Sequence, residues 1–158
     1  MNPSRRCLGA MALLSTLALV GMGCGSGATQ TFTGPADEVR AATVGNLGKV
    51  LVDGQGFTLY ILASDRGSGH STCSGTCADE WPPMTLSPGN AAPIAGPGIK
   101  PWLLGLTTGA GGGEQVTYNG WPLYRWPNDS EPGMATGQGV QDESGSWYVL
   151  SPAGDVVR

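Results

Sequence analysis

The chain has 158 residues, 27 of them glycine and 12 proline, and it carries eight basic against twelve acidic residues, for a formal net charge of −4. This length allows one ordinary domain or two small coupled units, and much glycine and proline with few charges favours a turn-rich β protein. An acidic chain without a basic cluster argues against nucleic-acid binding.

Residues 1–23 have the features of an export signal. Arg5 and Arg6 precede an apolar run at 8–20 that is too short for a stable membrane span and is followed at once by glycine and serine. We therefore predict a signal peptide over residues 1–23. Its removal would take two arginines with it and change the net charge from −4 to −6.

Cys24 follows this run, with Gly23 before it and a polar segment after it. The arrangement resembles the lipobox of bacterial lipoproteins, in which the cysteine is lipidated and becomes the first mature residue, although Gly21 stands where leucine is usual. The resemblance implies several acyl chains on Cys24, enough to anchor a protein stably. A soluble secreted protein is the alternative. We assign residues 24–42 to the lipidated cysteine and a flexible tether.

A repeat organises the rest of the chain. Residues 43–90 align with residues 107–154 at a constant offset of 64, without a gap. Glycine matches occur by chance in such a sequence, so the assignment depends on the others. These are Val52 with Val116, Leu59 with Leu123, Tyr60 with Tyr124, Asp65 with Asp129, Thr72 with Thr136, and Leu-Ser-Pro at 86–88 and 150–152. We predict a first repeat at 43–90, a Pro/Gly-rich bridge at 91–106 and a second repeat at 107–158.

Each repeat is predicted to begin with a hairpin. In the first repeat, residues 49–53 and 57–62 flank a glycine-containing turn. In the second repeat, residues 115–118 and 121–126 flank Asn119-Gly120, the strongest short-range hairpin signal.

Shorter strands are predicted after the hairpins. They lie near 84–86, at 147–150 and at 156–158, and residues 102–106 form either a strand or a turn of helix. A lone hairpin cannot bury its apolar face, so the repeats are expected to pack together. The predicted fold class is all-β and antiparallel, with two tandem hairpin-based repeats packed as one domain and approximate two-fold symmetry.

Tyr124, Trp126 and Asp129 form the motif Tyr-x-Trp-x-x-Asp. With Cys-x3-Cys, "WPP" and "WYVLSP", this motif makes the chain, over roughly 45–155, resemble the bacterial predicted lipoproteins with a Yx(FWY)xxD motif, also described as a secreted repeat of unknown function. The first repeat departs from the motif, since Leu62 stands in the aromatic position. The resemblance implies an exported, often lipid-anchored envelope protein with no biochemical activity attached to the family.

The motif residues are expected to be structural. Tyr124 and Trp126 project from the same face of a strand, where core packing is more common than an aromatic platform for a ligand. Asp65 and Asp129 follow strands, where a carboxylate commonly accepts backbone N–H groups and fixes a turn. The alternative is that the two aspartates act as acid and base or hold a cation. No Ser/His/Asp arrangement, phosphate loop or zinc spacing occurs in the sequence, so we expect no enzyme.

Cys73 and Cys77 occur in the first repeat only, opposite Gly137 and Gln141 of the second. Extended chain would hold their Cα atoms about 13 Å apart, so a disulfide needs a tight turn, which Gly75 allows. In an exported protein a disulfide is the expected state, and it would pin the loop.

The competing hypothesis is a metal site in the reduced protein. His70, Cys73 and Cys77 would offer an imidazole and two thiolates, a set that suits copper and is similar to that of copper-delivery proteins of the cytochrome oxidase assembly type. Met84 or Met134 could add a thioether. The sequence therefore predicts a lipid-anchored, non-catalytic structural or interaction module with an envelope protein as candidate partner. The alternative is an envelope copper-binding or electron-transfer protein.

Overall fold

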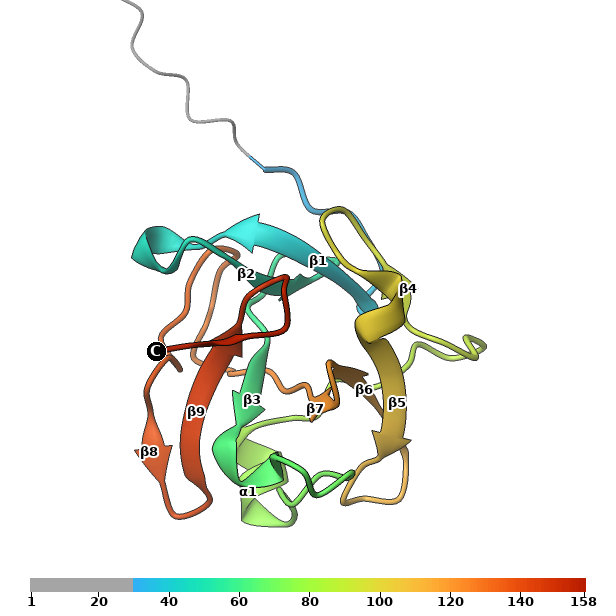
Figure 1. Cartoon of the computed structure of the whole chain (residues 1–158), viewed down its shortest axis with the longest axis vertical. Coiled ribbons are helices and arrows are strands. Elements are labelled where there is room, and N and C mark those ends of the chain that lie inside the picture. The colour runs from blue at the N-terminus through green and yellow to red at the C-terminus, as the bar shows by residue number, and fades with distance from the viewer. Residues whose placement is uncertain (1–29) are drawn as a thin grey trace, which may run out of the picture. The chain divides into compact units, whose positions relative to one another are not determined.

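Short β-strands are the main regular elements of the structure, a computed structural model that describes residues 30–158 (Figure 1). The predicted signal peptide at 1–23 and the predicted lipidation site at Cys24 lie outside the described residues. Thr31 to Arg158 form one compact unit. Within the described part of the chain, no helix is long and apolar enough to cross a membrane.

The strands are β1 (Glu38–Thr43), β2 (Lys49–Asp53), β3 (Tyr60–Leu62), β4 (Ile94–Ala95), β5 (Leu104–Thr108), β6 (Glu114–Tyr118), β7 (Trp121–Pro122), β8 (Gln141–Asp142), β9 (Gly145–Leu150) and β10 (Val156–Val157). The helical elements are one α-helical turn, α1 (Thr76–Glu80), and three short 3-10 segments, η1 (Gly45–Leu47), η2 (Ala63–Asp65) and η3 (Pro101–Leu103).

The strands form three small sheets. The first has the order β2-β1-β4, the second has the order β10-β9-β3 with β8 also paired to β9, and the third has the order β5-β6-β7. All pairings between these strands are antiparallel except that of β1 with β4. The all-β, mainly antiparallel fold class predicted from composition and turn signals is confirmed.

The hairpin predicted at Asn119-Gly120 is present between β6 and β7. Both turn residues have positive φ, 51° at Asn119 and 78° at Gly120, as a tight two-residue turn between twisted strands requires. The paired strands are shorter than predicted. β7 covers only Trp121–Pro122, and Tyr124 continues the line as an isolated bridge.

The predicted tether at 24–42 extends too far. Residues 38–43 form β1, which pairs with β2 on one side and β4 on the other, and Val39 is fully buried. The stretch "EVRAAT" contains a single large apolar residue, so its pattern alone does not identify a strand. Backbone pairing on both edges places it in the sheet.

Two further expectations for short segments need correction. The strand predicted near 84–86 is reduced to isolated bridges at Pro83 and Thr85, since Pro82 and Pro83 have no N–H to donate to a ladder. The predicted bridge at 91–106 contains β4, η3 and the start of β5. The segment expected to be either strand or helix supplies both in succession.

The two repeats are interlocked at their centre. Tyr60 N–H donates to the Tyr124 carbonyl and Tyr124 N–H donates to the Tyr60 carbonyl, both at 2.9 Å, so equivalent residues of the two repeats pair with each other. The end of each repeat also lies against the other. β9 pairs with β3, and Thr85 bridges to Gln115. β3 of the first repeat therefore completes a sheet whose other strands come from the second repeat.

The core consists of two groups of buried side chains. One is aliphatic, with Leu51, Leu59, Ile61, Met84, Leu123 and Leu150 among its members. The other is aromatic and includes Tyr60, Cys73, Trp81, Tyr124 and Trp147. Because side chains alternate along a strand, β3 contributes Tyr60 and Leu62 to the aromatic group and Ile61 to the aliphatic one. The aromatic group contains the motif tyrosines.

Candidate functional site

The motif tyrosines and aspartates form a crossed pair of hydrogen bonds. The Tyr60 hydroxyl donates to Asp129 Oδ2 and the Tyr124 hydroxyl donates to Asp65 Oδ2, each at 2.6 Å. Each tyrosine thus contacts the aspartate of the other repeat. All four side chains are at most 4% exposed, so the contacts are shielded from water.

Each aspartate also organises the loop that follows it. Asp65 Oδ1 accepts hydrogen bonds from the Thr72 backbone N–H at 2.8 Å and from the Thr72 hydroxyl at 2.6 Å. Asp129 Oδ1 accepts the same two bonds from Thr136, at 2.8 and 2.7 Å. These are the contacts predicted for a carboxylate that closes a turn after a strand. Each carboxylate therefore accepts hydrogen bonds from its own loop through one oxygen and from the tyrosine of the opposite repeat through the other.

The tyrosine hydroxyls are held in their neutral form. Burial raises the pKa of Tyr60 and of Tyr124 well above the ordinary value, and the hydrogen bond to the partner carboxylate and its negative charge raise each pKa further. A phenol of this kind donates a hydrogen bond to the carboxylate, keeps its proton and does not ionise near neutral pH. The arrangement therefore suits a structural contact better than proton transfer to a substrate.

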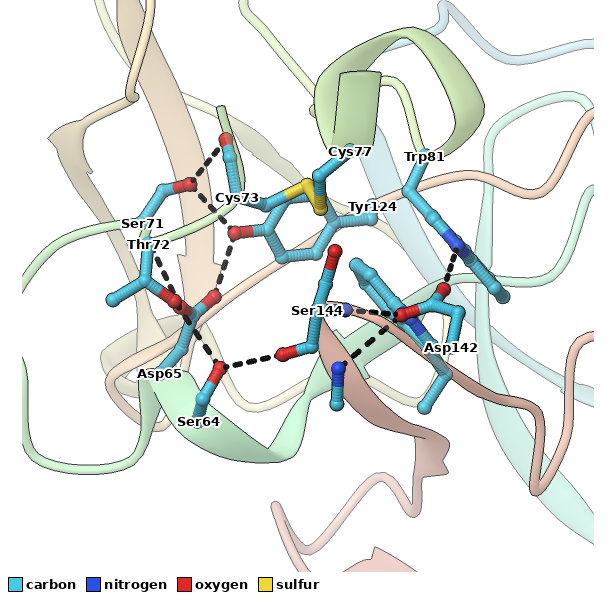
Figure 2. Close-up of a disulfide and its surroundings, with 12 residues drawn as sticks. Ser64, Asp65, Ser71, Thr72, Cys73, Cys77, Trp81, Tyr124, Asp142 and Ser144 are labelled. Atoms are coloured by element: carbon cyan, nitrogen blue, oxygen red, sulfur yellow. Dashed lines mark hydrogen bonds between the residues drawn. A yellow bond between two sulfur atoms is a disulfide. The ribbon is translucent and has the colours of Figure 1, made fainter. Parts of the chain in front are cut away.

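Each tyrosine hydroxyl has a second hydrogen-bond partner, and this partner differs between the repeats. The Tyr124 hydroxyl lies 2.7 Å from Ser71 Oγ, and Figure 2 shows it pointing toward both Ser71 and Asp65. The Tyr60 hydroxyl instead accepts the Gly137 backbone N–H at 3.2 Å. A Cβ added at Gly137 would lie 2.8 Å from a ring carbon of Trp81. The second repeat thus has no room for a side chain where the first carries Cys73.

Cys73 and Cys77 are joined by a disulfide in the structure (Figure 2), with their Cα atoms 5.3 Å apart. Gly75, with φ of 59°, supplies the turn between them and precedes α1, which contains Cys77. Cys73 is 2% exposed and belongs to the aromatic core. The bond ties the loop after Asp65 to that core.

The proposed metal ligands are not assembled in this oxidised form. His70 is exposed and Met84 lies in the aliphatic core, away from the core group of Cys73. Across residues 30–158, no group of three His, Cys, Asp or Glu side chains is placed to hold a metal ion. Copper binding by His70, Cys73 and Cys77 stays a prediction for the reduced protein.

Three tryptophans stack in the aromatic core. Trp81 lies between Trp126 and Trp147, with ring centroids 4.0 and 3.9 Å away. Asp142 Oδ2 accepts both the Trp81 and the Trp147 indole N–H, at 2.9 and 2.7 Å. Sequence reasoning identified Trp126 as a motif residue that packs in the core but missed the stack. Its other two members, from "WPP" and "WYVLSP", have no equivalent in the opposite repeat, so the repeat pattern did not connect them.

Two buried aspartates outside the motif were also missed. Asp37 accepts hydrogen bonds from the Ser87 backbone and hydroxyl and from Asn90. Burial alone would raise the pKa of Asp37, but these bonds outweigh it and lower the pKa. Asp53 lies 2.9 Å from Arg125, yet burial outweighs that charge and raises its pKa. No sequence spacing links these partners.

One cavity, of about 810 Å³, is an open depression. It lies between the loop at 66–69, the turn at 119–121 and the chain end at 154–158. None of the motif tyrosines or aspartates lines it. The motif tyrosines and aspartates, which are at most 4% exposed, are therefore not part of this depression.

Fold and site together define a class of protein, a β domain made from two interlocked repeats whose shared polar residues bond across the repeat boundary. The family model described as a secreted repeat of unknown function matches residues 41–85 and 105–151. The chain belongs to this family. The two matches begin 64 residues apart, the offset found in the sequence. No curated protein and no solved structure matches the chain.

Proposed function

We propose that this chain is an exported, lipid-anchored protein of the cell envelope whose β domain is a non-catalytic structural or interaction module. The observation that carries the proposal is the crossed pair of Tyr–Asp bonds. Polar groups support the fold when they are hydrogen-bonded to each other inside a core, and they are then not free to bind a substrate. The surface of the domain would then carry its function, with an envelope protein as the partner.

The anchor is tested by intact-mass measurement of the mature protein purified from membranes. We expect a chain that begins at Cys24 and carries acyl groups, and we expect Cys24→Ser to leave the envelope membrane. A mature mass that corresponds to an unmodified chain, with the protein in the soluble fraction, would show a secreted protein instead. The same spectrum reports the loss of two hydrogens expected for the disulfide between Cys73 and Cys77.

The non-catalytic role is tested on the motif itself. If the motif is structural, Tyr60→Phe and Tyr124→Phe lower the free energy of unfolding while partners captured by cross-linking in the envelope stay the same below the melting temperature. A variant of unchanged stability that loses its cross-linked partner would place the motif in the binding surface and contradict this role.

A second candidate function rests on the cysteine loop, which only the first repeat has. Reduction of the disulfide would free two thiols already held with Cα atoms 5.3 Å apart, a few residues after His70, and thiolates favour Cu(I). The reduced protein should then bind one Cu(I), and Cys73→Ser should abolish the binding. Reduced protein that takes up no copper would end this proposal.

A further inference from the structure

One stretch of the chain differs from the rest in charge. All twelve acidic residues of the chain lie outside residues 81–113, and this stretch of 33 residues contains a single charged side chain, Lys100. Glu38 lies beside this stretch, since it pairs with Ile94, but its carboxylate forms an ion pair with Arg40 at 3.3 Å. The stretch itself therefore adds no carboxylate that would repel a negatively charged partner.

The same stretch carries the exposed large apolar side chains. In the described part of the chain these are Trp102, 77% exposed, and Ile94, 40% exposed. A tryptophan exposed to this degree gains nothing from the core of its own domain. Exposed large apolar groups gathered on one face usually mark a contact with another protein or with a membrane.

An apolar groove of about 340 Å³ accompanies these two residues. Its lining includes Ala92, Pro93, Ala95, Pro101, Leu104 and Leu106. The first three flank Ile94 in the chain, and Pro101 precedes Trp102. We call Ile94, Lys100, Trp102 and this groove the docking face.

The docking face lies beside the point where the N-terminal segment enters the domain. β4 pairs with the first residues of β1, Ile94 with Glu38 and Ala95 with Val39. Figure 1 shows the blue segment that leads into β1 passing next to β4, with the start of β5 on the same side. Thr31 is seven positions after Cys24, so the chain between them spans at most about 25 Å. A lipid on Cys24 would therefore hold the membrane within reach of this face.

We propose that the docking face lies against the phospholipid surface. The inference rests on the proposed lipid anchor and adds an orientation to it. An indole prefers the boundary between headgroups and acyl chains, where its ring is buried and its N–H stays hydrated. The Lys100 ammonium faces lipid phosphates without a neighbouring carboxylate in the sequence. Two apolar side chains bind a membrane weakly, but an anchor on the same chain makes the contact intramolecular.

The test fixes the anchor chemically, so that it does not depend on lipidation in the cell. Residues 24–158 include the whole compact unit from Thr31 to Arg158. With Cys73 and Cys77 in their disulfide, Cys24 offers the free thiol, which is coupled to a maleimide lipid. The vesicles contain phosphatidylcholine and phosphatidylglycerol, with or without bromine on the acyl chains. Bromine quenches tryptophan emission only at short range.

We expect brominated vesicles to quench part of the emission, and Trp102→Phe, which leaves four tryptophans, to remove that quenching. Trp126→Phe is the matched control, because Trp126 stacks within the aromatic core. Its quenching should equal that of the parent protein. Ile94→Asp should reduce the quenching without changing the melting temperature, since Ile94 is exposed.

Equal emission from brominated and unbrominated vesicles would overturn the docking proposal. A change in Trp102 emission that depends on the density of protein on the vesicle, and not on bromine, would also overturn the proposal. That result would indicate a second copy of the chain on the docking face. Neither result bears on lipidation at Cys24, which the intact mass decides independently. Failure of the anchor and failure of the docking face are thus separate outcomes.

Discussion

The two repeats are most alike where they depend on each other and least alike at their outer loops. At the centre, each repeat supplies a Tyr, an Asp and a Thr in equivalent positions, with nearly equal hydrogen-bond lengths. In the loop that follows each motif aspartate, only the first repeat has a disulfide. Shared residues therefore mark the contacts on which both repeats rely, and differing residues mark places where each repeat is adapted separately.

The turn glycines show a second difference. Gly56 and Gly120 are equivalent and both have positive φ. A Cβ at Gly56 would come within 2.5 Å of the Phe32 ring, whereas nothing lies within 4 Å of one at Gly120. Phe32 is itself covered by the Arg40 guanidinium, 5.6 Å from its ring centre. Phe32, from the segment before β1, thus packs against the turn at Gly56 in the first repeat. The equivalent turn at Gly120 in the second repeat instead lines the open depression.

The largest predicted effect tests the crossing of the Tyr–Asp bonds. Asp129→Asn should lower the free energy of unfolding by about 2 to 3 kcal/mol, because a buried tyrosine loses its charged acceptor. The effect of Tyr60→Phe should be mostly lost when Asp129→Asn is present and fully retained beside Asp65→Asn. Urea denaturation of the single and double variants measures both. Coupling of Tyr60 with Asp65 of its own repeat would contradict the crossed arrangement.

The disulfide tests the difference between the loops. Replacing Cys73 and Cys77 by serine should cost about 2 kcal/mol, the value expected for closing so small a ring. Hydrogen exchange should increase in the loop between Asp65 and α1, and the reduced parent protein should behave in the same way. If exchange rises equally in both repeats, the bond does not act locally.

The reverse graft sharpens this prediction. Gly137→Cys combined with Gln141→Cys places cysteines in the equivalent loop of the second repeat. We expect this variant to be less stable than the parent, because a Cβ at 137 would lie 2.8 Å from Trp81. A stabilised graft would show that the stack can move.

The turn glycines provide a matched pair of substitutions. Gly120→Ala should cost about 1 kcal/mol, which is the strain of a side chain at positive φ. Gly56→Ala carries the same strain and must also displace the Phe32 ring, so it should cost more. Thermal melts of both variants test the difference, and Phe32→Ala should reduce the extra cost at Gly56. Equal melting temperatures for the two variants would mean that Phe32 does not fill that place in solution.

The smallest effect concerns alkaline pH. Because the pKa values of Tyr60 and Tyr124 are raised above 10.0 in the folded state, their contribution is complete below pH 10 and falls as the unfolded chain ionises first. Each tyrosine should account for a loss of about 0.8 kcal/mol at about pH 10.5. Tyr60→Phe should remove its share of this loss. Urea denaturation across that range tests it, and a parent-like pH slope in both Phe variants would contradict the burial of these hydroxyls.

Several structural features could be read from the sequence because they are local. Asn119-Gly120 indicated a tight turn by its chemistry, and Gly75 indicated one by the need to bring two cysteines together. The repeat offset identified equivalent positions, including the two threonines that bond the motif aspartates. These signals come from neighbouring residues or from direct comparison of two stretches of one chain.

Other features depend on residues that are far apart in the chain. β1 is held by pairing on both edges, so "EVRAAT" carries too weak a pattern by itself. The tryptophan stack joins residues 81, 126 and 147, which no spacing rule connects. The partners of the buried Asp37 and Asp53 are likewise more than 45 residues away.

The sequence by itself determined that this is a β protein made from two copies of one unit, with an export signal predicted before it, because composition, turns and repetition are properties of the chain alone. Only the tertiary structure decided that Tyr60 bonds to Asp129 and Tyr124 to Asp65. An offset of 64 states which residues are equivalent, but it does not state whether equivalent units face each other or exchange partners. Pairing of Tyr60 with Tyr124 at the centre of the fold makes that choice.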